Sequence, residues 1–165
     1  MPDKETIEHA MEDKREGKAP STQAGEFVRE EVHHVREGKH GARSTKQVIA
    51  IGLSKARAAG VELRPPAKGK ASAKTRRSAK SALRRGRSRQ KPSARRSRAV
   101  RGALRREGHS AAARTSLSRQ GRQAARKRSS RARSASAQKA ARTKTPQGRS
   151  AAARKAARTR ARNAA

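Results

Sequence analysis

Apolar side chains in the first 63 residues recur at the intervals of an α-helix. Between Lys4 and Arg15, the residues Ile7, Ala10 and Met11 follow the i, i+3, i+4 spacing of one helical face. This spacing predicts a first short helix over residues 4–15.

A second helix is predicted after a turn at Gly17 and Pro20, with Ser21 or Thr22 as its cap, and it runs to about Glu37. Its apolar residues form one stripe at the helical period, which is typical of a helix with one face in a core. The stripe consists of Ala24, Phe27, Val28, Val32 and Val35.

A third helix is predicted to begin at Ser44, because Gln47 three residues later completes a capping-box pattern. Gly38 and Gly41 bracket the connection before this helix, and Gly60 ends it. The apolar residues of the tract are Val48, Ile49, Ile51, Leu53, Ala56 and Ala59.

The end of this region is expected to fold back on itself. Val61 and Leu63 are predicted to pack onto the helices before Pro65 and Pro66 break the chain. Residues 1–63 are therefore expected to form a small helical domain with a marginal core.

The apolar pattern is lost after Pro66, where Lys, Arg, Ala, Ser and Gly dominate. The large apolar residues beyond this point are Leu83, Val100, Leu104 and Leu117. These four cannot offset the conformational entropy of ordering the rest, at roughly 1–2 kcal/mol per residue. The predicted fold class is all-α, with a three-helix N-terminal domain and a long, basic, Ala/Arg/Ser-rich tail over 64–165 that is disordered or transiently helical.

Short blocks of the tail recur, such as Ser110-Ala-Ala-Ala-Arg114 and Ser150-Ala-Ala-Ala-Arg154. Ala and Arg favour helix, but like charges four residues apart destabilise it until phosphate neutralises them. We therefore expect the tail to gain helix on binding a polyanion. The segments expected to do so are 94–106, 110–128, 132–144 and 149–162.

Charge divides the chain at the same point. Residues 64–165 hold 35 Lys and Arg residues against one acid, Glu107, whereas residues 1–63 hold eleven bases and eleven acids. The formal net charge of +34 therefore belongs to the tail alone. Such a dense polycation attracts a polyanion, and nucleic acid is the expected ligand.

Guanidinium groups suit bidentate contact with phosphate, so the arginine pairs and clusters of the tail are the candidate nucleic-acid-binding residues. Aromatic residues for base stacking are absent from the tail, which favours backbone contact with little sequence preference. Duplex DNA is favoured, and RNA remains open. The candidates are Arg76, Arg77, Arg84, Arg85, Arg95, Arg96, Arg105, Arg106, Arg126, Lys127, Arg128, Arg154, Lys155, Arg158 and Arg160.

The helical domain of residues 1–63, which we call the head, offers weaker signals for nucleic-acid binding. A helix-turn-helix would place Lys46, Lys55 and Arg57 near phosphate and Gln47 near a base edge. The connection over 38–43 is longer than that motif normally has. A helical domain for self-association or partner binding is the favoured interpretation.

A metal site is not expected. His33, His34 and His40 are the candidate ligands, but the chain has no cysteine, and the side chains of His33 and His34 diverge by about 100° on a helix. Pairing of His34 with Glu30, and of His33 with Glu37, is the favoured explanation.

Catalysis and bound cofactors are also not expected. Glu26, Glu30, Glu31 and Glu37 lie mostly off the valine stripe and are expected to face solvent. Neither a phosphate-binding GxxxxGK[ST] loop nor a nucleophile elbow is present. An apolar signal segment at Met1–Glu5 and a membrane-spanning run are lacking, so a cytoplasmic protein without membrane partners is expected.

The tract from Ser21 to Gly60, with Phe27-Val-Arg-Glu-Glu-Val-His-His34 at its centre, resembles a bacterial family of uncharacterised small basic proteins under a generic DNA-binding label. The tail is similar in character to the arms of linker histones. Both resemblances imply a histone-like, nucleoid-associated protein that binds DNA without sequence preference. An RNA- or ribosome-associated protein, and an adaptor with a polyanion-targeting tail, are the alternatives.

Overall fold

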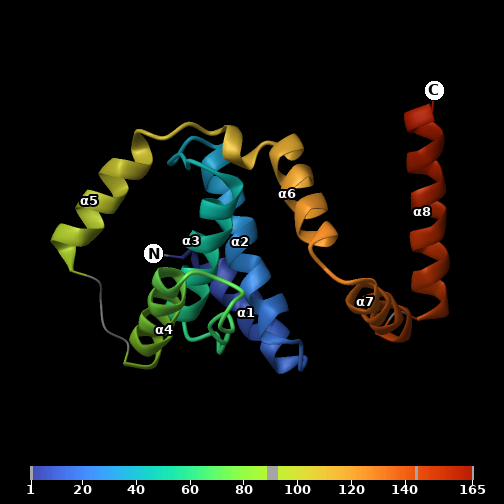
Figure 1. Ribbon diagram of the computed structural model, residues 1–165, viewed down its shortest axis with the longest axis horizontal. Coiled ribbons are helices and arrows are strands. Elements are labelled where there is room, and N and C mark those ends of the chain that lie inside the picture. Colours follow the sequence, from blue (N-terminus) through green and yellow to red (C-terminus); the bar gives the residue numbers. More distant parts are fainter. Residues whose placement is uncertain (1, 89–92, 144, 165) are drawn as a thin grey trace. The chain divides into compact units, whose positions relative to one another are not determined.

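The protein is all-helical over the residues that its computed structural model describes, which are 2–88, 93–143 and 145–164 (Figure 1). These residues contain no strand, which confirms the all-α class. Contacts group the chain into two compact units, residues 1–120 and 121–165. The elements are α1 (Lys4–Arg15), α2 (Pro20–Arg36), α3 (Thr45–Ala58), α4 (Ala73–Ser88), α5 (Ala94–Arg105), the 3-10 turn η1 (Ser110–Ala112), α6 (Arg114–Arg126), α7 (Ser130–Thr143) and α8 (Pro146–Ala164).

The three helices of the head agree with the sequence prediction, except at the start of α2. Pro20 is the first residue of α2, and the preceding Ala19 makes no side-chain cap. The prediction that Ser21 or Thr22 caps this helix is wrong, because proline at the first helical position needs no amide partner. The Ser44 cap of α3 is confirmed, since its hydroxyl accepts from the Gln47 amide at 3.3 Å.

The apolar residues of the head separate into two clusters. The first is centred on Phe27 of α2 and includes Val61, with Leu63 packed against it, so the predicted fold-back after α3 is confirmed. The second is centred on Val35 and Val48. Gly52 permits α2 and α3 to approach closely, because a Cβ there would lie 2.7 Å from the Val28 Cα.

Residues of the expected tail belong to the first unit. Helix α4 packs against α3 and buries Ala79 and Ala82. The two backbones are so close that a Cβ on Gly86 would lie 2.1 Å from the Arg57 carbonyl oxygen. The prediction of an unpacked tail from residue 64 onward is therefore wrong for α4.

A second part of the expected tail, residues 104–112, also packs onto the head; we name it the docked segment. The Gly41 amide donates to the Leu104 carbonyl and the Ala42 amide to the Gly108 carbonyl, both at 2.9 Å. Ala111 and Ala112 are buried in the cluster around Val35. Consequently the predicted helix over 110–128 is interrupted, because η1 and an extended Ala113 precede α6.

The second unit has helices without a core. The side chains of residues 121–142 are all exposed, as are those described in α8. The predicted segments 132–144 and 149–162 are separate helices, as expected from the proline between them, and Pro146 is the first residue of α8. The helices of this unit match the predicted segments 132–144 and 149–162 closely, so the prediction of a disordered or only transiently helical tail is wrong for them as well.

Candidate nucleic-acid interface

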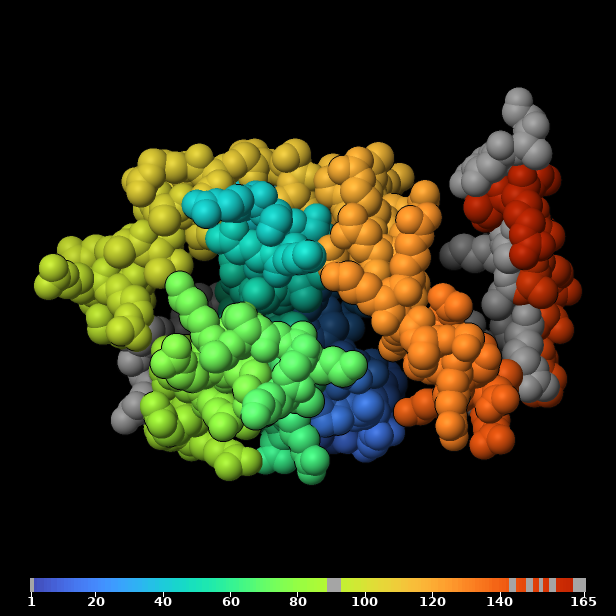
Figure 2. All heavy atoms as spheres, in the orientation of Figure 1, coloured from blue at the N-terminus to red at the C-terminus, as the bar shows by residue number. Residues whose placement is uncertain are grey.

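Helix α4 combines a buried alanine face with an opposite face of exposed cations. Ala79 and Ala82 pack on the head, so residues at the other side of the helix point to solvent. We call this outer side the cation face of α4, and Figure 2 shows the helix in light green at the surface. The cation face consists of Arg77, Lys80, Arg84 and Arg87.

The sequence prediction captured only part of this face. Arg77 and Arg84 are exposed, whereas Arg76 and Arg85 lie nearer the packed side and are half-buried. Lys80 and Arg87 were missed. The sequence signal for these two residues is the helical spacing of the small and apolar residues Ala79, Ala82, Leu83 and Gly86. This spacing marks their own side of α4 as packed and leaves the cations of the other side exposed.

The other predicted residues are exposed but are spread over several helices. Arg95, Arg96 and Arg105 lie on α5, and Arg106 follows its last residue. Arg126 ends α6, and Lys127 and Arg128 follow it. Arg154, Arg158 and Arg160 lie on α8, and the side chain of Lys155 lies outside the described residues.

Most cations of the head are engaged within the protein, in contrast to these predicted residues. Arg15 and Lys46 are exceptions, since both are exposed and form no ion pair in the described part of the chain. Arg29 pairs with Glu26 at 2.9 Å and Lys39 with Glu37 at 3.1 Å. Arg36 donates to the Ala112 carbonyl at 2.9 Å. By comparison, no carboxylate lies within ion-pair distance of any predicted residue whose side chain is described.

The helix-turn-helix alternative loses most of its contact residues. Lys55 pairs with Glu30 at 3.1 Å and also contacts Glu31. Arg57 is buried and donates to the Leu63 carbonyl at 3.0 Å; its burial lowers its pKa from the ordinary value. The Gln47 side chain accepts from the Arg43 amide, so only Lys46 of the four remains exposed and unbound.

Two acidic residues lie inside the head rather than in solvent. Glu30 and Glu31 are buried, so the expectation that they face water is wrong. Burial lowers the pKa of Lys55, but the adjoining carboxylates of Glu31 and Glu30 outweigh that effect and raise it above its ordinary value. The positive charge of Lys55 thus compensates part of the negative charge of Glu30 and Glu31 inside the fold.

The histidine pairings were predicted half correctly. His34 Nδ1 lies 3.7 Å from the Glu30 carboxylate, so the predicted partners are neighbours, and it lies 3.6 Å from the Glu31 carboxylate as well. His33 is exposed and forms no ion pair within the described residues, because Glu37 pairs with Lys39 instead.

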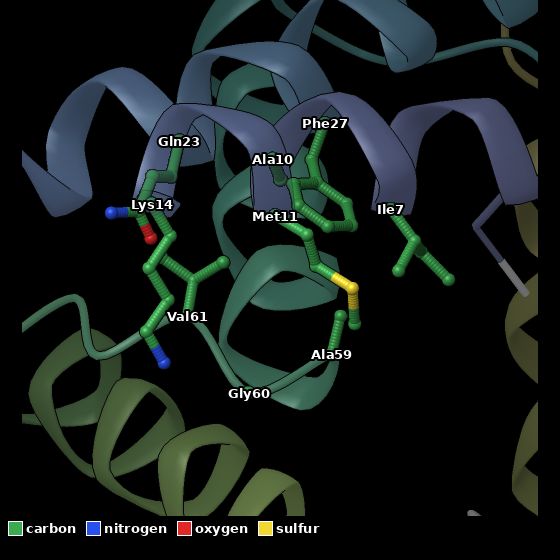
Figure 3. A pocket seen from close by; sticks show the side chains of 9 residues that line it. All are labelled: Ile7, Ala10, Met11, Lys14, Gln23, Phe27, Ala59, Gly60 and Val61. Carbon is green, nitrogen blue, oxygen red and sulfur yellow. The ribbon is translucent and has the colours of Figure 1, made fainter. Parts of the chain in front are cut away.

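A small apolar hollow lies beside the Phe27 ring (Figure 3). Its volume is about 80 Å³, and its walls come from α1, α2 and the chain after α3. Ligand pockets usually measure about 300–1,000 Å³, so this hollow suits no cofactor of that size. Met11 covers one side and is itself half exposed.

No family model, curated protein or solved structure matches the chain. Among the helices described, none is long and apolar enough to cross a membrane. Function must therefore be inferred from the residues themselves.

Proposed function

We propose that this chain is a histone-like, nucleoid-associated protein that binds DNA largely without sequence preference. Arginine and lysine residues beyond the head neutralise phosphates, and the folded head positions them. The proposal includes the resemblance to the bacterial small basic proteins, a cytoplasmic location on the nucleoid, self-association through α1–α3 and the lack of a catalytic role.

The observation that supports the proposal is the contrast in pairing between the two groups of cations. A head with internal ion pairs has little charge to offer a ligand. In the cation face of α4, Arg77, Lys80 and Arg84 form no ion pair among the described residues, and Arg87 lies 3.9 Å from the exposed Glu62 carboxylate. The exposed arginines of α5, α6 and α8 also keep their charge available. Because phosphate contact depends on charge and not on base identity, this arrangement favours backbone binding.

A gel-shift series at rising salt tests phosphate neutralisation. If 8–10 cations engage at once, affinity for a duplex falls by about 10³–10⁵ between 50 and 200 mM salt. Scrambled duplexes of equal length should bind equally well. A shallow salt dependence, or strong preference for one duplex sequence, contradicts the proposal.

Competition between duplex DNA, structured RNA and single strands tests the choice of nucleic acid. Preference for duplex DNA is expected, since single-strand binders use aromatic stacking that this chain lacks. Preference for structured RNA would instead favour the ribosome-associated alternative. Failure of all three to compete would favour the adaptor alternative.

A further inference from the structure

A group of two histidines and one glutamate lies buried in the head, between α2 and the connection that follows it. Glu31 and His34 come from α2, one helical turn apart, and His40 comes from the connection to α3. One ligand atom from each residue lies within 4.8 Å of the other two. The Glu31 side chain is fully buried, and those of His34 and His40 are 11% and 17% exposed.

We propose that Glu31, His34 and His40 form a binding site for one divalent transition-metal ion of the Zn²⁺ type. This site is independent of the nucleic-acid interface. Imidazole nitrogen and carboxylate oxygen are the ligands that Zn²⁺ takes besides thiolate.

The spacing of the ligand atoms suits such an ion. His34 Nδ1 lies 3.6 Å from Glu31 Oε1, and His40 Nε2 lies 3.3 Å from Glu31 Oε2. Two ligands at ordinary Zn²⁺ distances in tetrahedral geometry lie about 3.4 Å apart. Little movement is therefore needed for these groups to share an ion.

Each imidazole is oriented by an oxygen on its far side. His40 Nδ1 lies 3.0 Å from the Gly41 carbonyl oxygen, which can only accept a hydrogen bond. His34 Nε2 lies 3.3 Å from the Asp3 carboxylate. Metal-binding histidines commonly have such a carbonyl or carboxylate behind them, which fixes the nitrogen that carries the proton.

This orientation turns a nitrogen without a proton from each imidazole toward the Glu31 carboxylate. A neutral imidazole has one N–H, so with that proton on the far nitrogen, His34 Nδ1 and His40 Nε2 present lone pairs to Glu31. Both carboxylate oxygens of Glu31 are buried: Oε1 contacts the Lys55 ammonium, and Oε2 has no hydrogen-bond donor. A cation among these three groups removes a repulsion between acceptors that buried groups otherwise bear at high cost.

The charge of the surroundings favours a divalent ion. Asp3, Glu30 and Glu31 supply three negative charges, and Lys55 compensates one of them. With neutral imidazoles, the remaining charge of −2 matches one Zn²⁺. Lys55 also contacts Glu30 at 3.1 Å, so it keeps a partner when Glu31 binds the ion.

Binding of Zn²⁺, and of Co²⁺ as its visible substitute, to the full-length chain tests the site. We expect one ion per chain and, for Co²⁺, an intense visible absorption band typical of a four-coordinate ion. Both the bound ion and the band should be lost on adding a chelator. Zn²⁺ should shift the ring resonances of His34 and His40 and leave those of the exposed His9, His33 and His109 in place. This measurement uses the natural protein, so it does not depend on a variant that folds.

Neighbouring histidines provide matched variants. His40→Gln should weaken Zn²⁺ binding at least tenfold, and Asp3→Asn by about tenfold through the orientation of His34. His33→Gln should leave the affinity unchanged. The proposal is overturned if the natural chain binds no ion, if His33→Gln and His40→Gln weaken binding equally, or if the resonance shifts spread over the exposed histidines.

Discussion

Gly41 is the residue at which the docked segment meets the head most closely. A Cβ on this residue would lie 1.7 Å from the Glu107 carbonyl oxygen and 2.8 Å from the Gly108 carbonyl oxygen. The sequence predicted Gly41 only as a helix-exit glycine. A glycine is required at this position because the backbone of Glu107, 66 residues further along, passes so close to it. Local sequence patterns cannot indicate such a distant contact.

Gly41→Ala should therefore displace the docked segment and destabilise the first unit. We expect a loss of about 1–3 kcal/mol, the usual cost of overpacking. Denaturant unfolding measures the loss, and hydrogen exchange at the Ala42 amide reports whether its bond to Gly108 has opened.

Gly121→Ala is the matched control, because a Cβ there meets nothing within 4 Å. It should leave stability unchanged or raise it by up to about 1 kcal/mol, since alanine favours helix. Equal stability of the Gly41→Ala variant and the natural chain would show that the segment is not docked in solution.

The buried acids illustrate the limit of prediction at the scale of single residues. The valine stripe correctly identified the packed side of α2. The buried surface of α2 is wider than this stripe, because it also includes polar residues. Glu30 and Glu31 are buried because Lys55, 24 and 25 residues further on, and the distant Asp3 amide bind them. Partners so far along the sequence leave no periodic signal.

At the scale of elements, the same five residues adopt two structures. Ser110-Ala-Ala-Ala-Arg114 forms η1, an extended residue and the start of α6, whereas Ser150-Ala-Ala-Ala-Arg154 is continuous helix in α8. The first copy has contacts that the second lacks: the Thr45 hydroxyl donates to the Ala111 carbonyl at 2.7 Å, and Arg36 binds the Ala112 carbonyl. Helix propensity decides the second copy, and tertiary contacts decide the first.

Helix α4 was missed for a related reason. Its residues were assigned to the tail by composition, because lysine, arginine and serine outnumber its apolar residues. Small side chains nevertheless suffice where two helices approach closely, as Ala79, Ala82 and Gly86 do against α3. Counting large apolar residues underestimates a packed face of this kind.

The cation face of α4 can be tested as an element. Arg77→Gln with Arg84→Gln should lower the slope of log affinity for DNA against log salt by up to about 1.8, which is about 0.9 for each lost phosphate contact. Gel shifts at several salt concentrations measure this slope. The fold should be unaffected, because both side chains are exposed.

Arg15→Gln with Lys46→Gln is the control of equal charge on the head. Both side chains are exposed, and neither takes part in an ion pair in the described part of the chain. We expect no change in the slope. If both double variants lowered the salt slope equally, the head would have to contact DNA as much as the cation face of α4 does.

At the scale of the whole molecule, the two compact units divide the cations of residues 64–165. Twenty lie within the first unit and fifteen in residues 121–165. Charge and composition divide the chain at residue 63, whereas contacts divide it after Gln120. The folded unit extends to Gln120 because α4 and the docked segment use backbone contacts and alanines that composition does not reveal.

Truncation after Gln120 should separate folding from part of the binding. We expect cooperative unfolding of the remaining unit to persist, because its clusters lie within residues 1–120. The salt slope for DNA should fall as cations of the second unit are lost. Thermal unfolding and gel shifts measure the two effects.

A full-length chain in which the lysines and arginines of 121–165 are replaced by glutamine controls for length. It should bind DNA with the same salt slope as the truncated chain. A slope equal to that of the natural chain in both variants would restrict DNA binding to the first unit.

The docked segment bears on how fast a chain bound to DNA would transfer from one duplex to another. It fixes the chain at residues 104–112, so 16 cations lie in residues 64–103 before it and 17 in residues 113–165 after it. If the chain binds DNA as proposed, two groups of cations of nearly equal charge joined at one anchor make the second contact with DNA intramolecular, at millimolar effective concentration for a short flexible connection. One group can then release its phosphates and bind a neighbouring duplex while the other stays bound. Transfer between duplexes should then accelerate with the concentration of competitor DNA, instead of waiting for complete dissociation.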